Sequence, residues 1–188
     1  MISLHTPHGF NVEVPENINE DTTPRFNINF EAEQALKYYR DNGYVIFSRL
    51  VTSENCKKIR DIWETDIKSY NGTIYRQTTA KPEKNLLNEN NWIMNPILNL
   101  QSLNSNLFNN LRNTVENEVF SNDLVCAALK CILGEKPKIV QSMYFEGNAA
   151  TSEHQDSYYL DSEKIGEMTA AWLALEEIKA DAGRFFIC

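Results

Sequence analysis

The pattern of this chain changes from helical to extended at Pro137, and that change limits the possible folds more than any other feature. Before it, apolar residues recur three and four positions apart, as on the buried face of a helix. After it, the run KIVQSMYFEG (138–147) is rich in β-branched and aromatic residues and fits a strand. We therefore expect an α+β fold in which helices come first and a mainly β core follows.

The helical half is expected to hold four helices, with a short strand at 44–47 after the first. Their apolar stripes span Ala32–Tyr39, Cys56–Tyr70, Leu100–Leu111 and Leu124–Ile132. Gly43 lies where a left-handed residue would end the first helix, and Thr52 or Ser53 can cap the second. Each stripe is typical of a helix face that packs on a core.

Two parts of the helical half lack such periodicity. Residues 1–28 mix proline, asparagine and acids, and are expected to form an extended arm. Residues 73–99 predict a long irregular loop, and such a loop in a compact domain is usually functional or mobile. The length suits a single domain, in which 29–136 form the helical part and 137–188 the first strands.

The predicted strands differ in how they would be covered. In the first, alternate side chains would face opposite sides, with Ile139, Gln141, Met143 and Phe145 on one and Val140, Ser142 and Tyr144 on the other. The run 168–178 is nearly apolar, which favours a strand covered on both faces, although its alanines leave a helix as the alternative. A turn at 181–183 and a further strand, RFFIC (184–188), would follow.

Composition narrows the classes of partner. Lys and Arg total 18 against 26 Asp and Glu, a net charge of -8, which disfavours binding to nucleic acid or to an anionic membrane surface. The sequence has no apolar run long enough to span a membrane and no signal-peptide pattern, so a cytoplasmic protein with a small-molecule substrate is expected. The four cysteines lack the C-x-x-C pairs of a structural zinc site and are expected to be reduced.

The stretch SEHQDSYYL (152–160) places His154 two residues before Asp156. In an extended segment these side chains point the same way and could bind one metal ion. Iron in a non-haem oxygenase is held by two imidazoles and one carboxylate, which leave positions for substrate, co-substrate and O2. Chance also produces so short a motif, and the alternative is a surface histidine beside a turn-capping aspartate.

Three stretches in order give this motif a context: YYRDNGYVIFSRLVTSENCKKI (38–59), HQD (154–156) and AAWLALEEIKADAG (170–183). Together they resemble the phytanoyl-CoA dioxygenase family of Fe(II)- and 2-oxoglutarate-dependent oxygenases. The resemblance implies a double-stranded β-helix, a cupin-like jelly roll, packed against N-terminal helices.

The resemblance also implies roles for individual residues. His154 and Asp156 would bind Fe(II) and so be the catalytic pair, and Trp172 would line the 2-oxoglutarate pocket, although a packed core aromatic is the other interpretation. Gln141 and Met143 would lie near further co-substrate contacts. Four residues could wall the substrate pocket or could equally be packing or loop anchors: Tyr158, Tyr159, Trp92 and Arg76.

Two features that the family uses are missing from the expected places. The distal histidine and the arginine that binds 2-oxoglutarate have no counterpart, because Arg184 does not match and the other histidines, His5 and His8, lie in the arm. The jelly roll is therefore expected to be truncated at its C-terminus.

The expected activity is hydroxylation of a small molecule, with oxidative decarboxylation of 2-oxoglutarate to succinate and CO2 and consumption of O2. An intact Asp156 favours hydroxylation over halogenation, and the acidic charge favours a neutral or zwitterionic substrate over an acyl-CoA. The alternative is a non-catalytic remnant of such a domain that binds a ligand or a protein. A zinc hydrolase ranks below both because no water-activating base is recognisable.

Overall fold

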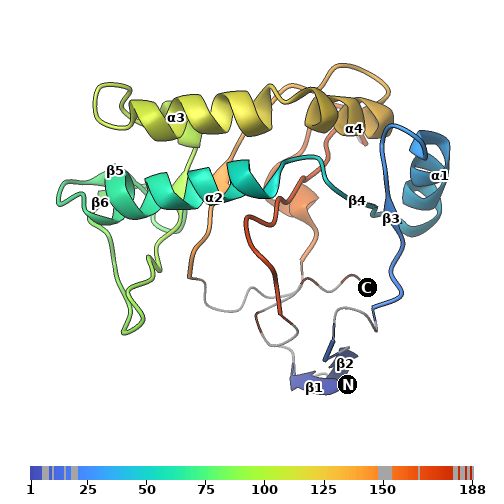
Figure 1. Cartoon of the computed structure of the whole chain (residues 1–188), viewed down its shortest axis with the longest axis horizontal. Coiled ribbons are helices and arrows are strands. Elements are labelled where there is room, and N and C mark those ends of the chain that lie inside the picture. The colour runs from blue at the N-terminus through green and yellow to red at the C-terminus, as the bar shows by residue number, and fades with distance from the viewer. Residues whose placement is uncertain are drawn as a thin grey trace.

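The computed structural model describes residues 1–5, 9, 11–14, 16–17, 21–147, 154–164, 166–179, 182, 185 and 187. The helices gather on one side of the molecule, and the N-terminal strands β1 and β2 lie on the opposite side (Figure 1). Helices α2 and α3 lie side by side, and α1 packs against α4. The runs that the sequence predicted as C-terminal strands lie below this helical layer in Figure 1 or outside the described residues.

Helices α1 (Ala32–Asn42) and α4 (Asp123–Leu133) confirm the first and fourth predicted helices. Gly43 ends α1 at φ 78°, a left-handed conformation that glycine adopts without strain, and its N–H donates to the carbonyl of Tyr39. The Asn122 side chain caps α4 by accepting hydrogen bonds from two backbone N–H groups, which would otherwise have no partner. Local capping thus fixes both helices.

Helix α2 (Ser53–Ile62) begins as predicted, with the Thr52 hydroxyl accepting from the N–H of Asn55 at 3.1 Å. It continues into a π-helical segment, η2 (Trp63–Lys68). Trp63 and Ile67 on this segment are buried. The predicted stripe is therefore mostly buried, while Ile62 and Tyr70 are partly buried and pack against the core.

The third predicted helix was wrong at its start. Residues 100–102 form a short 3-10 turn, η3 (Leu100–Ser102), and helix α3 begins only at Asn109 and runs to Val115, where the π-helical η4 (Glu116–Phe120) continues it. The side chain of Asn104 accepts from the N–H of Asn106, and its carbonyl accepts from Phe108. The bond to Phe108 has the four-residue spacing of an α-helix, so a new turn starts at Asn104, and the helix predicted from Leu100 does not continue through it.

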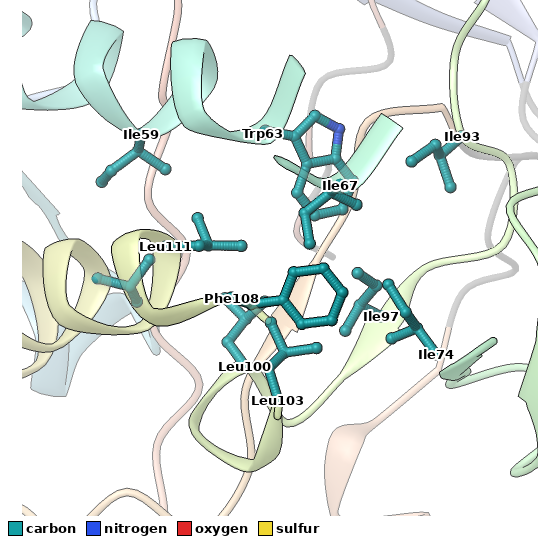
Figure 2. Packing of buried hydrophobic residues seen from close by; sticks show 11 residues of the cluster. Ile59, Trp63, Ile67, Ile74, Ile93, Ile97, Leu100, Leu103, Phe108 and Leu111 are labelled. Atoms are coloured by element: carbon teal, nitrogen blue, oxygen red, sulfur yellow. The ribbon is translucent and has the colours of Figure 1, made fainter. Parts of the chain in front are cut away.

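A single buried cluster joins the helices to the segment 73–99 (Figure 2). Its members are Ile59, Trp63, Ile67, Ile74, Ile93, Ile97, Leu100, Leu103, Phe108, Leu111 and Val115. Fully burying an isoleucine or leucine stabilises a fold by about 1.5–3 kcal/mol, so this cluster accounts for much of the stability. The segment 73–99 contributes three of these side chains, which shows that it packs in the core.

The described strands form four two-stranded sheets. The antiparallel pairs are β1 (Ile2–His5) with β2 (Asn11–Val14), β5 (Ile74–Tyr75) with β6 (Pro82–Glu83), and β7 (Ile97–Leu98) with β8 (Met143–Tyr144). The parallel pair is β3 (Arg25–Phe26) with β4 (Ile46–Phe47). The hairpin β1–β2 was not predicted, and the jelly roll remains a prediction. None of the described helices is long and apolar enough to cross a membrane.

The two described β-type runs differ from expectation. Only two residues of 138–147 are paired. The predicted alternation holds over 141–146, where Tyr144 is half-buried and Met143 and Phe145 are exposed, but Val140, expected on the side of Tyr144, is 62% exposed. The run 168–178 has no strand, and Trp172 is 54% exposed, so the prediction of a run covered on both faces was wrong. Leu175 alone of this run packs against the core cluster. Most of 181–188 lies outside the described residues.

Candidate metal centre

His154 and Asp156 come together at the start of a short 3-10 helix, η5 (Asp156–Tyr158). Gln155 is extended, with φ -103° and ψ 128°, so its neighbours point the same way. His154 Nε2 lies 3.2 Å from Asp156 Oδ1. The Asp156 carbonyl accepts from the N–H groups of Tyr159 and Leu160, which closes the turn after the pair.

The donor atoms of this pair fit one metal ion. Two ligands each about 2.1 Å from an ion and at a right angle to one another lie about 3 Å apart, close to the separation observed here. An imidazole nitrogen and a carboxylate oxygen are also donors that suit Fe(II). Both side chains are partly open to solvent, so an ion could reach them.

A third ligand is not found beside this pair in the described part of the chain. No group of three His, Cys, Asp or Glu side chains that could hold a metal occurs among the described residues. The ring of His5 bonds to Asn11 Oδ1 at 2.8 Å in the N-terminal hairpin, and His8 lies outside the described residues. The structure therefore offers two ligands at this place.

The aromatic residues that follow the pair do not enclose it. Tyr158 and Tyr159 are 81% and 80% exposed, and the ring of Tyr159 meets the His154 ring edge to face at 5.5 Å. Trp172 packs edge to face on Phe185, with ring centres 4.9 Å apart. Each of these aromatic side chains is largely open to solvent.

The remaining predicted site residues lie in different surroundings. Met143 is in β8 opposite Leu98, and Gln141 is exposed two residues before it. Trp92 is half exposed on a turn that Asn88 organises, because Asn88 Oδ1 accepts from the N–H groups of Asn90 and Trp92. Trp92 also lies beside Gly147, where a Cβ would come within 3.3 Å of the Trp92 Cβ.

Arg76 is completely buried and anchors the segment 73–99. Its guanidinium donates to the carbonyls of Glu83 and Asn95 and to Asn85 Oδ1, the last at 2.5 Å. Burial lowers the pKa of Arg76, and the Glu83 carboxylate acts in the opposite direction. The geometry supports the interpretation of Arg76 as a loop anchor over that of a wall of the substrate pocket.

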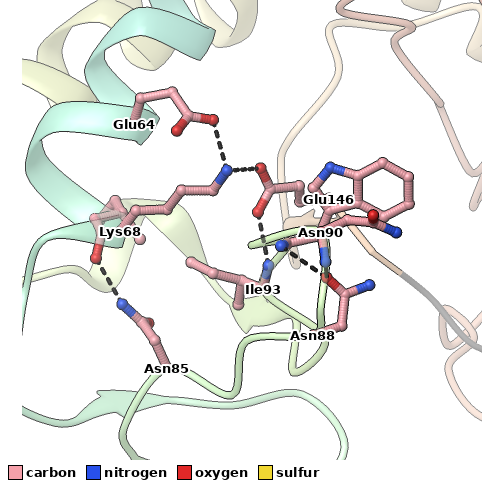
Figure 3. A network of polar contacts seen from close by, with 9 residues as sticks. Glu64, Lys68, Asn85, Asn88, Asn90, Ile93 and Glu146 are labelled. Atoms are coloured by element: carbon pink, nitrogen blue, oxygen red, sulfur yellow. Dashed lines mark hydrogen bonds and ion pairs between the residues drawn. The ribbon is translucent and has the colours of Figure 1, made fainter.

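The sequence did not predict a polar network that includes Glu146, which precedes His154 and Asp156, the metal pair, along the chain (Figure 3). Glu146 accepts a hydrogen bond from the N–H of Ile93 at 2.7 Å and pairs with Lys68 at 2.5 Å. Lys68 also pairs with Glu64 at 2.7 Å. These residues are ordinary surface types, and their wide separation along the chain gave no pattern to find.

Comparison with known families places this geometry in context. The family model for phytanoyl-CoA dioxygenase (PhyH) matches residues 39–187, well over half of the chain. The chain belongs to the phytanoyl-CoA dioxygenase family. The resemblance seen in the sequence is thereby confirmed, and an oxygenase-type enzyme is the general class that the family supports. Neither the curated proteins nor the solved structures gave a match.

Proposed function

We propose that this protein is an Fe(II)- and 2-oxoglutarate-dependent dioxygenase that hydroxylates a small molecule and converts 2-oxoglutarate and O2 to succinate and CO2. The observation that carries the proposal is the 3.2 Å approach of His154 Nε2 to Asp156 Oδ1 inside the range matched by the family model. His154 would bind iron as a neutral imidazole and Asp156 through one oxygen. Bound iron would supply the oxidising reactivity, which no side chain has.

The other residues proposed for this site would shape its surroundings. The exposed indole of Trp172 is open to contact with 2-oxoglutarate, and Gln141 and Met143 present exposed side chains on the strand before the pair. Tyr158 and Tyr159 supply aromatic surface next to the ligands, where a neutral or zwitterionic substrate could pack. We also propose that the protein acts in the cytoplasm, a compartment that suits its free cysteines.

An anaerobic titration tests the proposal. Purified protein is mixed with Fe(II) and then with 2-oxoglutarate, and the visible metal-to-ligand charge-transfer band is followed. The band should form with the unaltered chain, vanish in His154→Ala and persist in His5→Ala, a matched histidine held in the N-terminal hairpin. A band of equal strength in His154→Ala would contradict the proposed ligand. The lack of any band in the unaltered chain would favour the non-catalytic binding domain.

A further inference from the structure

The chain is tied to one helix on both sides of the metal pair. Before the pair, Glu146 is joined to Lys68 at the end of η2. After it, the carbonyl of Leu175 accepts a hydrogen bond from Arg60 Nη1 near the end of α2. The two ties lie eight positions apart along a continuous helical run, a spacing that puts them near the same face.

Contacts made by Trp63 and Ile93 strengthen the attachment of the chain around Glu146. The ring of Trp63, which is almost completely buried, stacks on Tyr144 with centres 3.7 Å apart and planes 9° from parallel. Burial raises the pKa of Tyr144 and Glu146 raises it further, so the phenol stays neutral against the indole. Gly147 then donates to the Ile93 carbonyl, while Ile93 donates to Glu146. The end of β8 is therefore held by side-chain and backbone bonds together.

The Lys68 ion pair is sheltered in a way that surface pairs are not. The side chains of Lys68 and Glu146 are only 10% and 16% exposed. Burial lowers the pKa of Lys68, but Glu146 and Glu64 outweigh it and the net shift is upward. A partly buried pair fixes geometry more strictly than an exposed one, and removing Lys68 leaves the sheltered Glu146 carboxylate without its cation. By contrast, the Lys57–Asp61 pair on α2 is well exposed.

We infer that Lys68 and Arg60 are positioning residues for the metal centre, which hold the chain on both sides of His154 and Asp156 against the α2–η2 helix. The inference rests on the function proposed for that pair. Neither residue need touch the ion. Tying both flanks of a segment lowers its conformational freedom, so less ordering remains to be done when the metal binds. Groups that hydrogen-bond a metal ligand typically change affinity by about 10–100-fold when removed, and ties that act through the backbone are expected at the low end of that range.

The test compares Lys68→Met, Glu146→Gln and Arg60→Met with Lys57→Met, which removes the exposed pair on the same helix. Co(II), used as the probe, is titrated into each protein and its visible absorption followed. Each of the first three changes should weaken Co(II) binding by about tenfold, and Lys57→Met should leave it unchanged. Lys68→Arg keeps the positive charge, so its affinity for Co(II) should lie within a few-fold of that of the unaltered chain. Unaltered affinity in all three variants would overturn the inference.

A second measurement needs no metal and separates this inference from the proposed function. Trypsin can cleave after the exposed Lys164, which lies between the ties. The initial rate of this cut should rise several-fold in Lys68→Met and Arg60→Met but not in Lys57→Met, under conditions where circular dichroism shows each protein folded. Equal rates would overturn the inference. If the unaltered chain binds no Co(II), the proposed function fails, and faster cleavage would still show that the two ties hold this part of the chain.

Discussion

The helix pair α2–α3 and the segment from His154 to Lys179 show opposite kinds of packing. Ile67 and Leu111 on the helices have no exposed surface, whereas Tyr158 is 81% and Trp172 54% exposed. The helices are held by a shared cluster of apolar side chains. The described contacts of the segment with the helices are the hydrogen bond from Arg60 to the Leu175 carbonyl and the packing of the Leu175 side chain. Stability should therefore depend on the first region and metal chemistry on the second.

The largest effect is expected from Asp156→Gly, which removes a proposed ligand from the exposed segment. Conversion of 2-oxoglutarate to succinate should be abolished, while the free energy of unfolding should change by less than about 0.5 kcal/mol because the carboxylate is largely exposed. Asp161→Gly, a change at another exposed aspartate of the same segment, should keep activity. Succinate formed at the normal rate by Asp156→Gly would remove Asp156 from the iron site.

Trp63→Ala should have the opposite effect. It removes a buried indole that stacks on Tyr144, and such a change typically costs about 3–5 kcal/mol of unfolding free energy. Urea denaturation measures the loss, with Trp92→Ala as the matched change at a half-exposed indole, where we expect less than about 1 kcal/mol. Equal losses in the two variants would contradict the assignment of Trp63 to the packed core and Trp92 to the surface.

Arg76→Ala tests whether the segment 73–99 belongs with the packed region. The change leaves the carbonyls of Glu83 and Asn95 and the Asn85 side chain without their donor, which should lower the unfolding free energy by about 2 kcal/mol. Urea denaturation again gives the value. A variant of unchanged stability but weakened substrate binding would instead place Arg76 in a pocket.

A smaller effect is expected at Asp21, at the entrance to β3. The backbone N–H of Thr23, helped by the Arg25 guanidinium, lowers the pKa of Asp21 from 3.8 to about 2. Because the folded-state pKa is the lower one, the ionised carboxylate stabilises the fold above about pH 4, and this contribution is lost as the pH falls toward 2. With screening by solvent we expect about 0.5 kcal/mol. Unfolding of Asp21→Asn should depend less on pH between 4 and 2, and an identical pH profile would contradict the assigned bonds.

The elements that the sequence predicted correctly are those decided by neighbours along the chain. Gly43, Thr52 and Asn122 end or begin helices through bonds to residues within four positions, so the pattern contained the information. The helix expected from Leu100 failed because the Asn104 side chain accepts from the N–H of Asn106 and starts a new turn there. Asparagine often forms such turns, but the helical spacing of the apolar residues around Asn104 led to the prediction of a helix.

Contacts between distant parts of the chain could not be predicted. The anchor made by Arg76 depends on carbonyls that a loop must first bring into place. The Lys68–Glu146 pair depends on how β8 meets η2. Among the proposed site residues, only His154 and Asp156 could be placed together from the sequence, because their two-residue spacing in extended backbone points both side chains the same way. Trp172 could be named only by family resemblance, and its role remains a prediction.

The most direct test of the proposed metal centre is the iron retained per chain. Protein is loaded with Fe(II) under anaerobic conditions, desalted and analysed for metal, alongside His154→Ala, Asp156→Ala and His5→Ala. If His154 and Asp156 bind the ion, the unaltered chain and His5→Ala should keep close to one equivalent, and the other two variants almost none. Equal iron in all four proteins would contradict a metal site at His154 and Asp156.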